Sequence, residues 1–296
     1  MRSGGGADGR GQGGRSRRIT VITNGNFFSH VGLRQLLARE DVELQVFVTT
    51  GLRRTSGNRA KEALQLLRRW GLRYTLYKVA VYALPFLGEK VGRRALTVRA
   101  ACRRQGIPCH LVRSVNKPPA KDAIADFAPD LLLSFSCPYK IGDELLGVPR
   151  VGSLNVHSSL LPAYAGVCTY VHVLADGQPV TGVTVHEMVS RFDAGMIVAQ
   201  GEVPIEPRAS VFSLFATQCE MAGPLLNQAV GQCLDRGEIF GREQDFGRRT
   251  YRGEPTKDDV ARLRQRGHRL LRSKDVWSLL SGFSESRVTS RVGTGS

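Results

Sequence analysis

The run DLLLSFS, residues 130–136, is apolar almost without interruption, as is typical of a strand buried on both faces of a parallel sheet. Outward from it, the chain alternates between short β-type runs and segments of helical period. Strands are expected at residues 19–23, 43–50, 107–112, 151–157, 180–188 and 196–203, the last two as an antiparallel pair. Helices are expected at residues 33–39, 120–127 and 210–236. This alternation predicts an α/β domain with a mostly parallel sheet.

The composition is that of an ordinary globular protein, with 296 residues of which 42% are hydrophobic and 23% are charged. Six irregularly spaced cysteines form no C-x-x-C pair, which argues against a disulfide framework and against a zinc site, so no metal is expected. The sequence shows neither an apolar leader nor a run long enough to span a bilayer. Together with reduced cysteines, these features predict a cytoplasmic protein.

The charge balance is strongly basic, because 42 Lys and Arg against 26 Asp and Glu give a net charge of +16. Such a surface attracts phosphates, nucleic acid, anionic lipid or an acidic carrier protein, or it only aids solubility. Residues 1–17 are rich in Gly, Arg and Ser, so a disordered basic tail is expected there. A similar disordered tail is expected at residues 281–296.

A basic and apolar segment of helical period, residues 60–105, interrupts the alternation. Apolar side chains crowd residues 76–87, and cationic side chains flank them. Such a helix can lie on an anionic membrane or cover a greasy substrate, and it can equally form a helical hairpin that packs on the sheet. The charge and period leave these alternatives open.

Asn155 and His157 lie two residues apart at the end of a predicted strand, so their side chains share one face. Ligands in open α/β sheets gather beyond the carboxyl ends of strands. Asp193 lies in a later loop, followed by Gly195. A histidine moves protons near neutral pH, an asparagine donates to a developing oxyanion, and a carboxylate orients a histidine and favours its charged form. The three residues together predict catalysis.

The segment that contains these residues resembles the folate-dependent formyltransferases. The resemblance rests on N-x-H-x-S-L-L-P at residues 155–162, on Tyr164 and Gly166, and on Asp193 with Gly195. Residues 182–200 and 129–161 are also similar to the family, and the resemblance extends over residues 19–236. It implies a Rossmann-like formyltransferase domain at residues 18–240, with the helical insertion at residues 60–105 and a C-terminal extension at residues 241–280.

The resemblance also implies a mechanism with 10-formyltetrahydrofolate as the formyl donor. Asn155 would stabilise the oxyanion, His157 would polarise the formyl group and exchange protons, and Asp193 would orient His157. The folate is expected to contact the segment after the buried strand and the loop before Asp193, at Phe135, Cys137, Pro138, Tyr139, Lys140, Ile141, Leu154, Val189 and Phe192. The acceptor is expected near Asn24, Gly25, Asn26, Tyr164, Gly166 and His186. A buried structural role remains an equal alternative for His186.

The acceptor is expected to be the primary amine of an amino sugar, of a modified amino acid, or of a lipid- or carrier-linked compound. The family's tRNA enzymes add a β-barrel, whereas residues 241–280 read as a loop followed by a basic helix, which disfavours tRNA despite the charge. Glycinamide ribonucleotide remains an alternative, with residues 23–29 as a phosphate-approaching turn. Formyltetrahydrofolate hydrolase and a non-catalytic nucleic-acid-binding protein are two further alternatives. The sequence leaves the oligomeric state open.

Overall fold

The computed structural model describes residues 16–49, 59–92 and 95–282, with the backbone alone for residues 59–66. The tails predicted to be disordered therefore lie almost wholly outside the described residues. At the N-terminal side the prediction was one residue too long, because the first strand already begins at Arg17. Arg17 pairs with Val42 of the neighbouring strand and its guanidinium lies 2.7 Å from the carboxylate of Asp235, which explains its place in the sheet. At the other end, the last helix reaches Ser281.

A seven-stranded sheet forms the centre of the molecule, in the order β3-β2-β1-β4-β5-β7-β8. Its five parallel strands are β3 (Cys109–Val112), β2 (Val42–Thr49), β1 (Arg17–Thr23), β4 (Leu131–Phe135) and β5 (Gly152–His157). The antiparallel strands β7 (Val180–Glu187) and β8 (Ile197–Pro204) continue the sheet from β5. The α/β class with a mostly parallel sheet is confirmed, and all of β4 is buried, as its apolar run predicts.

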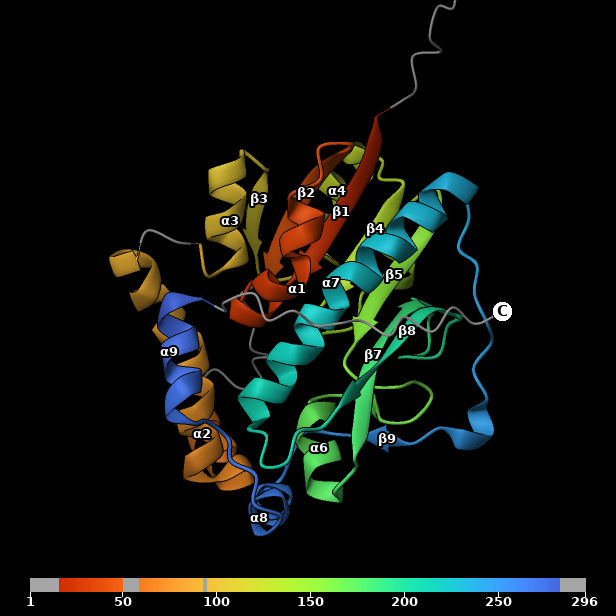
Figure 1. Ribbon diagram of the computed structural model, residues 1–296. Coiled ribbons are helices and arrows are strands. Elements are labelled where there is room, and N and C mark those ends of the chain that lie inside the picture. The colour runs from red at the N-terminus through yellow and green to blue at the C-terminus, as the bar shows by residue number, and fades with distance from the viewer. Residues whose placement is uncertain (1–15, 50–58, 93–94, 283–296) are drawn as a thin grey trace, which may run out of the picture.

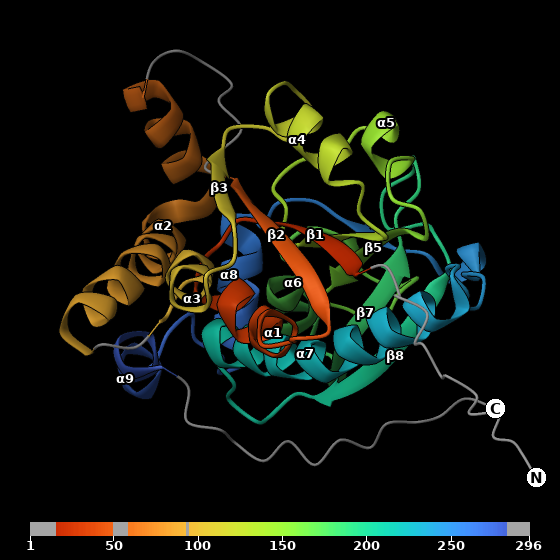
Figure 2. The ribbon, with the colours of Figure 1, turned by 90° about the horizontal axis from the view of Figure 1, so that it is seen from above.

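Helices cover both faces of the sheet (Figures 1 and 2). One face carries α1 (Phe27–Leu37) and α7 (Val211–Arg236), and the other carries α4 (Ala120–Phe127) and the short α5 (Asp143–Leu146). Adjacent residues of β1 divide between two apolar clusters, with Val21 in the larger one beneath α1 and α7 and Ile22 in the smaller one. This division follows from the alternation of side chains along a strand.

Side-chain caps set where the helices begin. The Asn26 side chain accepts a hydrogen bond from Ser29 N, so α1 begins at Phe27, earlier than the apolar period alone predicts. Ser210 forms a capping box with Ser213 at the start of α7, and Gly237 ends that helix in the left-handed conformation. These signals position α1 directly after β1, so the chain leaves the sheet edge through the turn before Asn26.

The segment expected to be helical between residues 60 and 105 contains α2 (Arg59–Gly92) and α3 (Val98–Gln105). Gly71, with φ 77°, divides α2 into two helices. Tyr74 and Tyr77 of the second part are buried in the larger apolar cluster. This part of α2 therefore packs against the protein, chiefly against α9, whereas the packing alternative placed it on the sheet.

The C-terminal part of the chain returns to the carboxyl ends of the parallel strands. In Figure 1 it is drawn in blue, with α8 and β9 near α6, below the sheet. Its elements are the 3-10 turn Phe246–Arg248, β9 (Tyr251–Arg252), α8 (Lys257–Gln265) and α9 (Ser273–Ser281). Their partners from earlier in the chain include β6 (Ala165–Gly166) and α6 (Thr169–Asp176). β9 pairs with β6, and α9 packs against α2. In the described part of the chain, no helix combines the length and the apolar character needed to cross a membrane.

Candidate active site

The candidate site lies where β1, β4 and β5 end side by side and the strand order reverses between β1 and β4. Ligands in open α/β sheets bind beyond the carboxyl ends of strands at such a reversal. Asn155 and His157 stand at the end of β5, on one face of the strand, as predicted. In the antiparallel pairing with β7, Asn155 lies opposite His186. The sheet register thus brings a second histidine to the predicted pair.

Asn155 and His186 are joined by a side-chain hydrogen bond, with 3.1 Å between Asn155 Nδ2 and His186 Nε2. His186 Nδ1 lies 2.7 Å from the carbonyl oxygen of Glu187, which only accepts. Nδ1 therefore carries the ring proton, and Nε2 is left as the acceptor for an Asn155 N–H. Among the described residues, no side chain or carbonyl accepts the second N–H of this half-buried amide. That N–H is available to a ligand at the strand edge.

Burial keeps His186 neutral. Its side chain is only 2% exposed, and desolvation lowers its pKa from 6.5 to about 4, against the opposing charge of Asp193. A protonated ring would carry a proton on Nε2 and would lose its capacity to accept from Asn155. The neutral ring is thus the form that orients Asn155 near neutral pH.

His157 and Asp193 form the second contact of the site. His157 Nε2 lies 2.8 Å from the carbonyl oxygen of Tyr164, so Nε2–H donates to it, and Nδ1 lies 3.6 Å from Asp193 Oδ1. The same carboxylate oxygen is 3.7 Å from His186 Nε2. The His157 and Asp193 side chains are 7% and 10% exposed. A proton taken up at His157 Nδ1 would therefore lie against a carboxylate that is largely shielded from water.

Backbone groups hold Asp193 in place. Its other oxygen, Oδ2, accepts a hydrogen bond of 2.8 Å from the backbone N–H of Gly166. Gly166 has φ 112°, and a Cβ at this position would lie 2.0 Å from the carbonyl oxygen of Arg252. Gly195 also lies close to its neighbour, the strand β7, where a Cβ would meet the Glu187 carbonyl at 2.4 Å. Both glycines are therefore required by close backbone approach.

The sequence prediction missed two residues that fix the loop before Asp193. Arg249 donates to the carbonyl oxygens of Phe192 and Asp193, at 2.8 and 2.7 Å, and buried Gln244 donates to the carbonyls of Asp193 and Gly195. Both donors come from the C-terminal extension, far from Asn155 and His157 in the chain. No local pattern marks them, since their acceptors are backbone carbonyls.

Tyr164 contributes to the site through its backbone. Its carbonyl accepts from His157, as described, and from the hydroxyl of Ser159 at 3.1 Å. Its phenol group points elsewhere and donates to Asp176 at 3.0 Å, with the Arg252 guanidinium 5.5 Å from the ring centroid. The structure thus accounts for Tyr164 as a positioning residue, and its predicted contact with the acceptor stays a prediction.

The residues predicted to bind the folate fall into two groups. Phe135, Leu154 and Ile141 are buried in the apolar clusters, so a ligand would reach them only through the backbone. The more accessible positions follow β4 or precede Asp193, and they are Cys137, Pro138, Tyr139, Lys140, Val189 and Phe192. Val189 is 38% exposed and Phe192 is 55% exposed. The contact of these residues with a folate stays a prediction.

The turn predicted to approach the acceptor, Asn24, Gly25 and Asn26, lies at the end of β1, two strands from β5. Asn24 Oδ1 accepts from Asn26 N and from Ser29 Oγ, so these side chains shape the turn and cap α1. Neighbouring strands are about 4.8 Å apart, which puts the turn roughly 10 Å from β5 along the same edge. The turn thus borders the crevice, and its contact with an acceptor stays a prediction.

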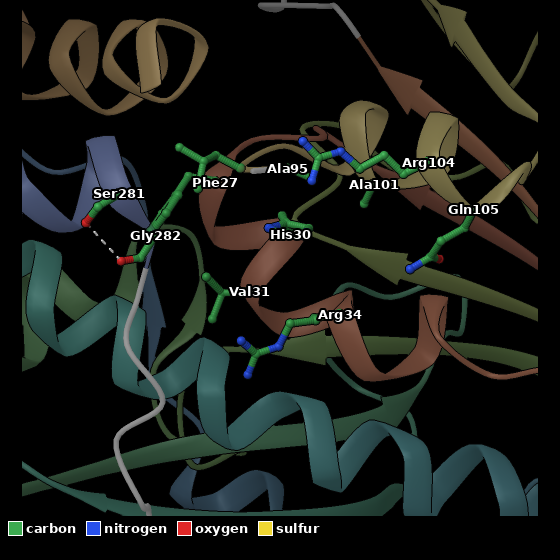
Figure 3. Close-up of a pocket in the computed structure, with 11 residues that line it drawn as sticks. Phe27, His30, Val31, Arg34, Ala95, Ala101, Arg104, Gln105, Ser281 and Gly282 are labelled. Carbon is green, nitrogen blue, oxygen red and sulfur yellow. Dashed lines mark hydrogen bonds between the residues drawn. The ribbon is translucent and has the colours of Figure 1, made fainter. Parts of the chain in front are cut away.

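A cavity lies away from this site, between α1, α3 and the end of α9 (Figure 3). It has a volume of about 330 Å³, and its wall includes Phe27, His30, Arg34 and Arg104. Burial, followed by the charge of Arg34, lowers the pKa of His30 to about 4. None of the residues that surround Asn155 line this cavity. The candidate site is therefore identified by its convergent polar groups and not by cavity size.

Comparison with known proteins agrees with this geometry. Residues 95–230, which include Asn155, His157, His186 and Asp193, match the protein family described as formyl transferase. This match covers slightly less than half of the chain, and it supports the resemblance to the folate-dependent formyltransferases. The chain is 33% identical over 195 residues to the methionyl-tRNA formyltransferase of Thermotoga neapolitana. The aligned stretch covers 64% of this chain and 62% of the relative. The match thus spans less than two thirds of that relative's length.

Solved structures share the fold at lower sequence identity. A 4-N formyltransferase from Francisella tularensis superposes with a TM-score of 0.53 and 17% identity, over 81% of this chain and 77% of the other. An N-formyltransferase from Helicobacter canadensis, in complex with folinic acid and dTDP-3-aminofucose, has a TM-score of 0.55 and 13% identity, over 85% and 80%. At these identities the comparison establishes the fold.

Proposed function

We propose that this protein transfers a formyl group from 10-formyltetrahydrofolate to the primary amine of a small or specialised acceptor. The observation that carries the proposal is the convergence of Asn155, His157, His186 and Asp193 at one strand edge. The formyl transferase match supports the reaction class. The Helicobacter structure, which holds folinic acid and an aminosugar nucleotide, supports a folate donor and a sugar amine as the acceptor.

The donor supplies a carbonyl carbon that an amine can attack. Asn155 then acts through the N–H that His186 does not accept, because this N–H can donate to the formyl oxygen as it gains negative charge. One such donor in a preorganised site contributes about 3–4 kcal/mol to the stability of the transition state. His186 acts as a positioning residue, since it orients Asn155 without touching the reacting atoms.

His157 and Asp193 serve the proton movements of the reaction. The attacking amine loses a proton as its nitrogen bonds to the formyl carbon, and the folate nitrogen gains one as its bond to that carbon breaks. His157 stabilises a transferred proton at Nδ1, 3.6 Å from Asp193 Oδ1, while Tyr164 O holds the opposite ring nitrogen. Gly166 N–H keeps the carboxylate aimed at the ring. In this proposal His157 transfers the proton and Asp193 stabilises the charged form of the ring.

The acceptor side of the crevice favours a small molecule. Residues 241–280 contain α8 and α9, and the described part of this extension has no strands beyond β9 that would form the β-barrel expected of the tRNA enzymes. The Asn24–Asn26 turn lies at the same edge of the sheet as Asn155, where the acceptor amine is proposed to bind. Methionyl-tRNA formylation is a second candidate, which the 33% identity to a methionyl-tRNA formyltransferase favours.

The first test replaces the reacting groups. We expect Asn155→Ala and Asp193→Ala each to lower the turnover at least about a hundredfold while the fold is retained. Asn227→Ala and Asp258→Ala remove the same chemical groups away from the site and should leave turnover within about twofold. Tetrahydrofolate release is measured with saturating acceptor, and circular dichroism verifies folding. Near-normal turnover in both site variants would refute the assignment.

The second test identifies the acceptor. The purified protein is incubated with 10-formyltetrahydrofolate and a panel of aminosugar nucleotides, amino acids, glycinamide ribonucleotide and methionyl-tRNA. Mass spectrometry then shows which amine gains one formyl group. Release of tetrahydrofolate that depends on a small amine supports the proposal, whereas release without any amine would indicate a hydrolase. Formylation of methionyl-tRNA alone would replace the small-molecule acceptor with tRNA.

A further inference from the structure

The second part of α2, residues 72–92, is apolar on two opposite sides. Its inner side packs into the protein, with Tyr74, Tyr77 and Val81 at 0%, 5% and 3% exposure. Its outer side carries Leu72, Leu76, Val79 and Phe86 at 58–62% exposure, spaced so that they share one helix face. An amphipathic helix on the surface of a globular protein normally turns a polar face outward. Among the described residues, none covers the outer side of α2 as an apolar surface is normally covered.

This apolar surface is concentrated and extended. Of the 16 large hydrophobic side chains that are exposed in the described part of the chain, eight lie on α2, between Leu67 and Val91. From Leu72 to Leu87 the face extends for about 22 Å at 1.5 Å per residue. Scattered exposed apolar residues are ordinary, whereas a contiguous patch of this size marks an interaction surface.

The inner contacts prevent the helix from rotating to hide this face. Tyr74 and Tyr77 belong to the main apolar cluster, and α9 packs along α2. Gly88 lies so close to α9 that a Cβ would meet the Leu280 carbonyl at 2.3 Å. Figures 1 and 2 both show α2 at the outer margin of the molecule, with α9 beside it and the sheet on its inner side. The outer side chains are therefore held toward solvent.

The charges around this face are positive. Arg68, Arg69, Arg73 and Lys90 are exposed on α2. Glu89 is the one acidic residue between residues 67 and 92, and its carboxylate accepts from Leu96 N, Thr97 N and Thr97 Oγ1 within the protein. The outer face therefore combines apolar side chains with unopposed cations, in a chain with a net charge of +16.

A tryptophan lies on the neighbouring helix. Trp277 of α9 is 71% exposed, although large aromatic side chains are usually at least partly covered. Tryptophan is enriched where protein meets the boundary between the lipid headgroups and acyl chains, because its ring is apolar and its N–H is polar. Its presence on the helix that packs against α2 fits the same kind of surface.

We propose that the outer face of α2, residues 72–87, docks this protein on an anionic membrane surface. An apolar helix face with a cationic rim lies in the plane of the interface, where the apolar side chains enter the headgroup region and the cations contact acidic lipids. The charge distinguishes this partner from a second copy of the chain, because two such cationic faces would repel each other. The proposal concerns where the protein acts and is independent of the proposed acceptor.

Vesicle binding of the full chain tests the proposal. Wild-type protein should sediment with vesicles of phosphatidylcholine and phosphatidylglycerol and should bind pure phosphatidylcholine vesicles far more weakly. Leu76→Gln with Phe86→Gln should lower partitioning to the anionic vesicles about tenfold or more, because two exposed apolar side chains lose their affinity for the interface. Leu111→Gln with Val180→Gln, at exposed apolar positions on strands, is the matched control and should bind as the wild type does.

Both double variants alter surface side chains, so thermal melting should show intact folding for each. Absence of wild-type binding to anionic vesicles would overturn the proposal. Equal binding of the wild type and the α2 variant would also overturn it, because attraction would then come from the general positive charge. A further contrary result would be a wild-type dimer in light scattering that the α2 variant converts to a monomer, which would assign the face to a second copy. Formyl transfer is assayed separately and does not enter these outcomes.

Discussion

The buried histidine at the centre of the candidate site should make the protein sensitive to mild acid. His186 has a pKa of about 4 in the folded protein against 6.5 in an unfolded chain, because burial penalises its charged form. Between these two values the unfolded state binds a proton that the folded state excludes. The stability linked to His186 is therefore fully present above about pH 6.5 and is lost as the pH falls toward 4.

The size of this effect follows from the two pKa values. The linkage relation gives a loss of about 2 kcal/mol between pH 7 and pH 5, and about 3 kcal/mol once the pH is below both values. A loss of 2 kcal/mol is a large fraction of the stability of a typical domain. Because the side chain is 2% exposed, solvent screening does not reduce it substantially.

Equilibrium unfolding in urea, followed by tryptophan fluorescence at pH 7 and pH 5, measures this contribution. We expect the wild type to lose about 2 kcal/mol more between the two pH values than His186→Gln, which has no titrating ring. The exposed His110 provides the matched control, and His110→Gln should follow the wild type. Parallel losses in the wild type and His186→Gln would refute the reasoning that burial keeps this ring neutral.

Two further predictions concern the groups that hold Asp193. Gly166→Ala should lower the free energy of unfolding in the urea assay by about 2 kcal/mol or more, because φ is 112° and the new Cβ would meet the Arg252 carbonyl. The control Gly231→Ala places its Cβ in open space on a helix and should be neutral or stabilising. Arg249→Ala should lower turnover about tenfold or more with the melting temperature nearly unchanged, because the loop loses two charge-assisted hydrogen bonds. The neighbouring Arg248 side chain is 84% exposed, and Arg248→Ala should leave turnover unchanged. Equal effects of the two members of either pair would contradict the proposed support of Asp193.

Local sequence patterns were sufficient for the sheet and for the end of β5. The uninterrupted apolar run at residues 131–135 is a buried strand, and the two-residue spacing of Asn155 and His157 is enough to place both side chains on one face. These features depend on the chain's own periodicity, so they can be read without knowing its neighbours. The starts of helices were harder to predict. The first residue of α1 is set by the Asn26 cap, which lies outside the apolar period.

Contacts between segments that are distant in the chain could not be predicted from local sequence patterns. The sequence left open whether His186 contacts the acceptor or has a structural role. The strand register places it opposite Asn155, from which its ring accepts a hydrogen bond. Gln244 and Arg249 hold the Asp193 loop from about fifty residues away, through backbone carbonyls that exist in every residue. Nothing in the local pattern around either donor indicates its partner.

The sequence by itself determined the seven strands of the main sheet and the identity of the polar residues at the end of β5, because both follow from side-chain type and spacing. Only the tertiary structure decided how those residues act together. It sets the neutral state of His186 through burial, the orientation of Asn155 through that ring, and the exposure of α2's outer face through the packing of its inner one. Burial and hydrogen-bond partners depend on what the fold brings near, and this depends on the whole chain.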